Sequence, residues 1–258
     1  MKNKILIISL SVLAFIVLIV ILSSTVFCLK TVEINFMSNT VTLTNKETEI
    51  IETGEFKYNQ NIFFVSKNNY IKNLEEKNPY LKVVNIETSF PNKLVINAVE
   101  RNELFAIKGY EENEYKYHLI LDDELKILAT IENYTNLYTN PILVTINGEN
   151  TLANVAGQTL NSLHNNTLTK LAVELYAYNN NPLMLKANFE EIILNYSNKS
   201  DIKIVMRSGV NIVLKNAETK LTEKFMLALS YYNGLENKTI GTITTYEDSS
   251  NNVVGYYF

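Results

Sequence analysis

Two runs of neighbouring carboxylates are the residues of this sequence whose types could support acid–base catalysis. They are Asp122-Asp123-Glu124 and Glu190-Glu191. A retaining glycosidase needs two carboxyl groups about 5–5.5 Å apart on either side of one bond. Neighbouring residues of an extended chain instead point to opposite faces. We therefore expect both runs to be solvated turns or strand ends and not a catalytic pair.

The histidines and the single cysteine are the candidates for metal binding and nucleophilic catalysis. They are His118, His164 and Cys28. One cysteine excludes an intrachain disulfide and a zinc site built from several cysteines. Both histidines stand among polar residues, which favours surface positions. Phosphate-binding, dinucleotide-binding and His-Glu-x-x-His motifs are absent as well. We therefore expect no enzyme activity, no metal, no cofactor and no small-molecule substrate.

The overall charge argues against a nucleic acid as partner. The 258 residues include 27 acidic and 23 basic side chains, which give a net charge of −4. A nucleic-acid-binding domain needs a basic face against the phosphates. The length and the hydrophobic content of 47% allow one or two globular domains with real cores.

An uncharged segment over residues 5–29 predicts a transmembrane helix. Its 25 residues would form a helix of about 37 Å, longer than the ~30 Å hydrocarbon core. Lys2 and Lys4 precede it, so the positive-inside rule makes residues 1–4 a short cytoplasmic start and places the chain from residue 30 outside. A cleaved signal peptide is the alternative, but its apolar region spans only about 7–15 residues and needs small residues at the cleavage site.

A strand and a short helix are predicted directly after this segment. Residues 30–36 alternate between apolar and polar side chains, which is typical of a half-buried strand. Thr44 and Glu47 fit a capping box at the start of a helix that ends near residue 53. Gly54 suits the position just after the helix.

A second helix and two strands complete the first predicted domain. Ser66 is placed to cap the helix and Pro79 to stop it. Residues 84–90 and 94–98 alternate as two strands around a Phe-Pro-Asn corner. The order β-α-α-β-β, with two helices covering a three-stranded sheet, predicts a small α+β domain over residues 30–106.

Residues 107–258 predict a second α+β domain rich in antiparallel sheet. Two amphipathic helices are expected, over residues 167–178 and 219–233. The strands are expected over residues 115–121, 125–130, 141–146, 192–196, 202–207, 210–214, 240–246 and 253–258.

The order of several short motifs resembles the FtsQ/DivIB family of bacterial cell-division proteins. Ser89-Phe90-Pro91 leads into Leu94-x-Ile96-x-Ala98-x-Glu100-Arg101, which is similar to the most specific phrase of that family. The likeness continues along nearly the whole chain. It departs at Glu103, where the family has proline, at Thr244, where it usually has aspartate, and in the hairpin after Asp122, which lacks the family's glycine.

This resemblance implies a fold and a function. The domain at 30–106 would be a POTRA module, and the chain would be a single-pass scaffold in the plasma membrane at the division septum, held there by residues 5–29. The partners implied are the FtsB/DivIC-like and FtsL-like single-span proteins, and through them the septal peptidoglycan synthase. The alternative is a membrane-anchored exported enzyme or sensor of the cell wall.

The closing strands are the predicted partner-binding site. An exposed sheet edge offers unpaired backbone groups to a partner strand, and strand-like sequence continues to residue 258. The residues expected to take part are Thr242, Ile243, Thr245, Tyr246, Val254 and Tyr256. The alternative is that residues 253–258 only complete the core sheet.

The adjacent charges of Glu100 and Arg101 are predicted to mark the junction between the two domains. Because neighbouring strand residues leave opposite faces, each side chain would pair separately or meet solvent. An exposed strand end without a junction role is the alternative.

Overall fold

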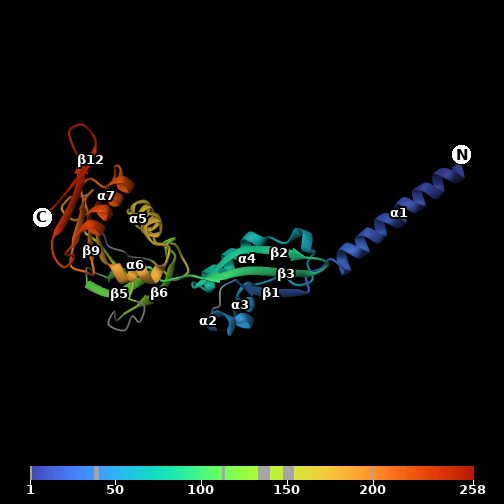
Figure 1. The fold of residues 1–258 in the computed structure, drawn as a ribbon. Helices are drawn as coiled ribbons and strands as arrows, with labels where there is room; N and C mark the ends of the chain where they lie inside the picture. The colour runs from blue at the N-terminus through green and yellow to red at the C-terminus, as the bar shows by residue number, and fades with distance from the viewer. Residues whose placement is uncertain (1, 38–40, 112–113, 133–139, 148–153, 199) are drawn as a thin grey trace. The chain divides into compact units, whose positions relative to one another are not determined.

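The computed structural model describes residues 2–37, 41–111, 114–132, 140–147, 154–198 and 200–258 (Figure 1). The chain forms two compact α+β units, Met1–Arg101 and Asn102–Phe258. Each unit has its own sheet and its own hydrophobic core.

The N-terminal helix α1 covers Lys2–Thr25. Cys28 and Leu29, which the sequence placed in a transmembrane helix, are instead buried in the first unit. The backbone explains this, because the N–H of Leu29 donates to the carbonyl of Gln60 and the carbonyl of Leu29 accepts from Asn59. Within the described residues, no helix combines the length and the apolar character that a membrane crossing requires.

The first unit has the predicted β-α-α-β-β order around a three-stranded sheet. The strands lie in the order β1-β3-β2, with β1 parallel and β2 antiparallel to the central strand. They are β1 (Thr31–Phe36), β2 (Leu81–Ser89) and β3 (Lys93–Glu100). The helices are α2 (Val41–Thr44), α3 (Glu47–Thr53), the 3₁₀ turn η1 (Ile62–Phe64) and α4 (Lys67–Lys77).

The predicted capping box at Thr44 is wrong. Thr44 is the last residue of α2, and the residue that precedes α3 is Lys46. The carboxylate of Glu47 does not reach back along its own helix, because it accepts a hydrogen bond from the backbone N–H of Ile34 in β1 at 3.2 Å. Glu47 therefore joins the helix to the sheet.

Gly54 and Ser66 also act differently from the prediction. Gly54 has a right-handed backbone, with φ −69°, so it is not a left-handed helix stop. A Cβ there would come within 2.3 Å of the ring of Phe56, so glycine makes room for that side chain. Ser66 does precede α4, but its side chain makes no capping hydrogen bond.

The second unit contains a nine-stranded mixed sheet in the order β12-β11-β10-β9-β8-β7-β4-β5-β6. Five of its eight strand pairs are antiparallel, as the sequence predicted for a sheet rich in such pairs. Three pairs are parallel, namely β4 with β7, β7 with β8 and β10 with β11. The strands are β4 (Phe105–Glu111), β5 (Glu114–Leu121), β6 (Ile127–Ile131), β7 (Ile142–Ile146), β8 (Phe189–Leu194), β9 (Ile202–Met206), β10 (Asn211–Leu214), β11 (Thr242–Glu247) and β12 (Val253–Tyr257).

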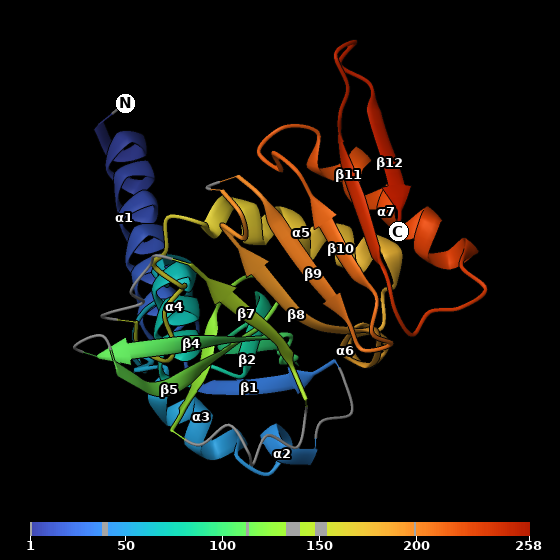
Figure 2. The ribbon, with the colours of Figure 1, turned by 90° about the vertical axis from the view of Figure 1, so that its left-hand side faces the viewer.

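Helical connections account for two of the parallel pairs, because a parallel pair needs a crossover between its strands. The helices α5 (Asn165–Tyr178) and α6 (Pro182–Asn188) connect β7 to β8, and α7 (Leu221–Gly234) connects β10 to β11. Figure 2 shows α5 and α7 on the same side of the sheet, behind β8 to β12.

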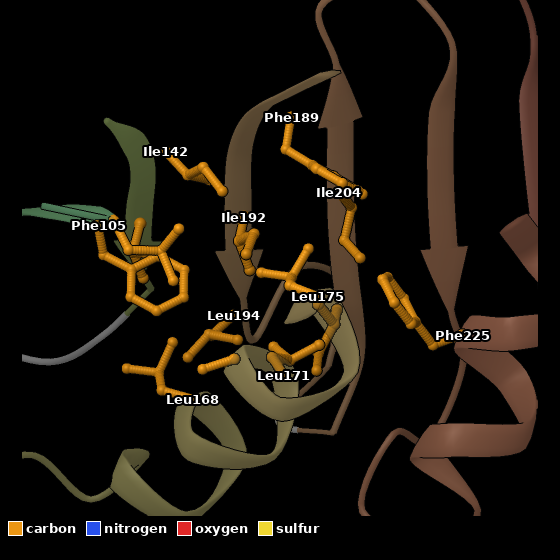
Figure 3. Close-up of a cluster of buried hydrophobic side chains, with 14 of the residues drawn as sticks. Phe105, Ile142, Leu168, Leu171, Leu175, Phe189, Ile192, Leu194, Ile204 and Phe225 are labelled. Atoms are coloured by element: carbon orange, nitrogen blue, oxygen red, sulfur yellow. The ribbon is translucent and has the colours of Figure 1, made fainter. Parts of the chain in front are cut away.

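The core of the second unit lies between these helices and the sheet. Figure 3 shows Leu168, Leu171 and Leu175 of α5 directed toward Ile192 and Leu194 of β8, with Phe225 of α7 beside them. All of these side chains are at most 1% exposed. The leucines recur at three and four residues, as one face of a helix requires.

Candidate functional site

The acidic runs have structural roles. Asp122 is buried, and its Oδ1 accepts hydrogen bonds from the backbone N–H groups of Glu124 and Lys126 at 3.0 and 2.7 Å. Glu191 accepts from the hydroxyl of Thr145 at 2.6 Å, while its neighbour Glu190 is exposed. The two runs therefore organise a turn and a strand.

His118 is not the surface residue that the sequence predicted. His118 in β5 is only 4% exposed, and burial, with a smaller contribution from Lys108, lowers its pKa to about 4. His164 is half-buried, and its Nε2 lies 3.3 Å from the side-chain nitrogen of Asn195. His118 pairs with Lys108 across the β4–β5 ladder, so a buried strand position explains its environment.

A hollow of about 30 Å³ lies beside His164, Asn195 and Asp201. This volume suits a water molecule, whereas a small-molecule site spans about 300–1,000 Å³. The carboxylate of Asp201 is already occupied, since it accepts from Lys215 at 2.6 Å and from the backbone of Asn216 at 2.9 Å. The hollow therefore does not fit a cell-wall substrate.

Glu100 and Arg101 lie at the end of the first unit. Arg101 is buried, its Nη2 lies 3.1 Å from the carboxylate of Glu75 in α4, and its Nε donates to the carbonyl of Leu81 at 3.3 Å. Glu100 is half-buried, and burial raises its pKa. Arg101 thus links the end of β3 to α4 and to the start of β2.

On three of the four outer strands of the two sheets, one backbone position is bonded to a carboxylate or to a backbone segment of the same unit. In β1 the N–H of Ile34 donates to the Glu47 carboxylate, and in β2 the N–H of Val83 donates to the Glu75 carboxylate at 2.8 Å. In β6 both backbone groups of Ile127 bond to the segment 157–158 at 2.8 Å. Each of these hydrogen bonds occupies a backbone group that another strand would need for pairing.

The fourth outer strand, β12, pairs with β11 on one side only, as Figure 2 shows. Thr242 and Phe258 exchange two backbone hydrogen bonds, of 2.8 and 3.1 Å. In an antiparallel pair the backbone groups of alternate residues face the partner strand, so the N–H and C=O groups of Tyr256 and Val254 also face β11. The backbone groups of Val253, Gly255 and Tyr257 consequently point to the outer side of the sheet.

The side chains of the β11–β12 hairpin divide between two faces. Ile243 and Thr245 are fully buried, so these two predicted site residues position β11 and do not present a surface. Tyr246 and Val254 form a cross-strand pair on the opposite face, which also carries Thr242 and Tyr256. Four of the six predicted residues therefore lie together on an accessible face.

An aromatic row, formed by Tyr246, Tyr256 and Phe258, runs along that face. The ring centroids of Tyr246 and Tyr256 are 6.0 Å apart, and those of Tyr256 and Phe258 are 5.6 Å apart. Tyr256 is 48% exposed and Phe258 is 70% exposed. Exposed rings next to an outer strand are well suited to contact an added strand.

A buried lysine holds the hairpin to α7. Lys224 is fully buried, and its ammonium group donates to the carboxylate of Glu247 at 2.5 Å and to the carbonyls of Asn216 and Thr219 at 2.8 Å. The hydrogen bond from Lys224, followed by that from Thr219, lowers the pKa of Glu247. The structural role of Lys224 was not predicted from the sequence, although a lysine on the apolar face of a helix is a visible signal.

Two comparisons with known proteins show what the first unit and the chain are similar to. Residues 29–101 match the family model of the FtsQ-type POTRA domain. Over 190 residues the chain is 26% identical to the cell division protein DivIB of Clostridium tetani (strain Massachusetts / E88). The match covers 71% of this chain and 65% of that protein, a little under two thirds of the relative's length. The first unit thus matches the FtsQ-type POTRA domain, and the chain is similar to a cell division protein over most of its length.

Proposed function

We propose that this chain acts in cell division as a non-enzymatic scaffold that binds a partner strand along β12. The observation that carries the proposal is the geometry of this strand, because three residues direct their backbone groups outward and an exposed aromatic row lies beside them. An added strand gains main-chain hydrogen bonds of about 0.5–1.5 kcal/mol each, and side-chain contacts set its register.

The partners that we propose are the FtsB/DivIC-like and FtsL-like division proteins. The family resemblance supports them, and the DivIB relative is itself a cell division protein. Through these partners the chain would reach the septal peptidoglycan synthase. Glu100 and Arg101 would fix the point at which the POTRA unit passes into the partner-binding unit.

The location that we propose is the outer face of the plasma membrane at the division septum. Lys2 and Lys4 precede the uncharged segment 5–29, which supports an N-terminus on the cytoplasmic side. The large apolar side chains of α1 from Ile8 to Ile21 are about half to two-thirds exposed, so they would be stabilised by contact with lipid.

Binding of a purified partner segment tests the scaffold proposal. The full chain, in detergent, is titrated with the extracytoplasmic segment of the DivIC-like protein from the same genome. Replacing Tyr256 and Phe258 by alanine should weaken binding at least tenfold, because exposed aromatic anchors carry much of the energy of an interface. Tyr196→Ala is the matched control, since Tyr196 is also exposed, at 42%, but follows β8. Equal affinities for all three proteins would refute the proposed surface.

A further inference from the structure

One of the outward backbone groups of β12 already has a partner within the chain. The hydroxyl of Tyr231, in α7, donates a hydrogen bond to the carbonyl oxygen of Gly255 at 3.0 Å. Gly255 lies opposite Thr245, whose own carbonyl faces β10 and accepts from the backbone N–H of Lys215 at 2.9 Å. The Gly255 carbonyl therefore points away from β11, to the side where a partner strand would add.

The contact depends on the absence of a side chain at residue 255. A Cβ at Gly255 would lie 3.2 Å from Cε2 of Tyr231 and 3.1 Å from Cγ2 of Thr245. The phenol ring thus lies directly against the backbone of β12. Tyr232, the next residue of α7, is buried and fixes the helix, whereas Tyr231 itself is 38% exposed.

This cap is of a weaker kind than those on the other outer strands. Carboxylates of Glu47 and Glu75 cover β1 and β2, and two backbone hydrogen bonds cover Ile127 of β6. Hydrogen bonds to charged groups are roughly twice as strong as those between neutral groups. On β12 a single neutral, solvent-accessible hydroxyl holds a carbonyl that an incoming strand also needs.

We propose that Tyr231 is a displaceable cap on the partner-binding edge. In the unbound chain its hydroxyl occupies the Gly255 carbonyl and reduces pairing with unsuitable strands. A partner strand of the right register replaces this hydroxyl with a backbone N–H, and the ring of Tyr231 turns toward solvent. The inference rests on the proposed addition of a partner strand to β12 and specifies how that edge is regulated.

The variant Tyr231→Phe tests the cap, because it keeps the ring and removes only the hydroxyl. The full chain is titrated with the extracytoplasmic segment of the DivIC-like protein. The variant should bind roughly two- to tenfold more tightly than the wild type, since no hydrogen bond has to be displaced. A residue with a merely structural role would leave the affinity unchanged or lower it.

Tyr257→Phe is the matched control. It also removes a hydroxyl that donates to a backbone carbonyl, that of Ile240 at 2.8 Å, but Ile240 lies outside β12. This control should show no gain in affinity. A gain of the same size in both variants would overturn the assignment to Tyr231.

The remaining outcomes separate the two proposals. If the wild type binds the segment and Tyr231→Phe binds it equally or more weakly, the capping role of Tyr231 is refuted, but strand addition at β12 is not. If neither protein binds the segment, strand addition at β12 is refuted, and the capping role of Tyr231 is refuted with it. Carbonyl-¹³C labelling of glycine gives a readout without partner, because loss of the hydroxyl should shift the Gly255 signal. An unmoved signal would refute the contact.

Discussion

Arg101 and Glu75 form an ion pair whose side chains are only 5% and 17% exposed. Removing one member of a buried pair leaves the other charge desolvated without its partner, which costs about 3–5 kcal/mol. We expect Arg101→Met to lower the free energy of unfolding of the first unit by about this amount in urea titrations.

Lys72→Met is the control for this prediction. The pair of Lys72 with Glu76 in the same helix is exposed, at 70% and 47%, with a separation of 3.8 Å. An exposed helical pair is worth about 0.5 kcal/mol or less. Similar losses in the two variants would contradict a structural role for the buried pair.

His118 predicts a pH dependence of the second unit. Its pKa in the folded chain, about 4, lies below the usual 6.5, first because of burial and then because of Lys108. The unfolded chain therefore binds more protons between these values, so the free energy of unfolding should fall as the pH drops from 6.5 toward 4. Urea titrations across this range should show a shallower fall for His118→Gln. An identical pH slope would refute the assignment.

At the level of elements, Lys224 joins the start of α7 to the end of β11. Replacing it with methionine removes the ammonium donor from Glu247 and from the carbonyls of Asn216 and Thr219. We expect Lys224→Met to lower the melting temperature and to accelerate hydrogen exchange in β11 and β12. Lys170→Met, at an exposed position of α5, should leave both unchanged. If hydrogen exchange in β11 and β12 is the same in Lys224→Met as in the wild type, this role of Lys224 is contradicted.

The sequence predicted most strands because one face of each is buried, as Leu94 and Ile96 of β3 illustrate. The start of β4 escaped prediction because Phe105, Ala106 and Ile107 are all buried, so no alternation exists to detect. In β2 a register shift after Val83 turns Val84 outward, against the predicted alternation.

Two further features were not predicted from the sequence, one that has a local signal and one that has none. The helix α6 begins with Asn181-Pro182, and the Asn181 side chain accepts from the N–H of Leu183 at 2.9 Å, a start signal that was visible in the sequence. The contact of Tyr231 with Gly255 joins a helix to a strand 24 residues away. Such pairs depend on tertiary packing, which periodicity does not encode.

At the level of the whole molecule, the proposed location predicts accessibility to protease. A protease added to intact spheroplasts should digest residues 30–258, because both units would lie outside the cytoplasm. A cytoplasmic protein serves as the control for intact membranes. Protection of both units in intact spheroplasts, followed by digestion after lysis, would contradict the proposed location.

Two neighbouring valines test the central claim, that a partner strand adds to β12. The N–H of Val253 points outward, whereas Val254 faces Tyr246 within the β11–β12 ladder. Proline removes a backbone N–H and is tolerated where that group faces solvent at an outer strand. Val253→Pro should therefore retain the fold, while Val254→Pro breaks the ladder and should destabilise the hairpin.

The most direct measurement is the affinity of Val253→Pro for the DivIC-like segment, with the fold checked by thermal melting. If a partner strand adds to β12, the melting temperature should stay close to that of the wild type and binding should weaken by about tenfold or more, since one main-chain bond is lost and the proline ring obstructs the added strand. A folded Val253→Pro chain that binds with the wild-type affinity would contradict strand addition at β12.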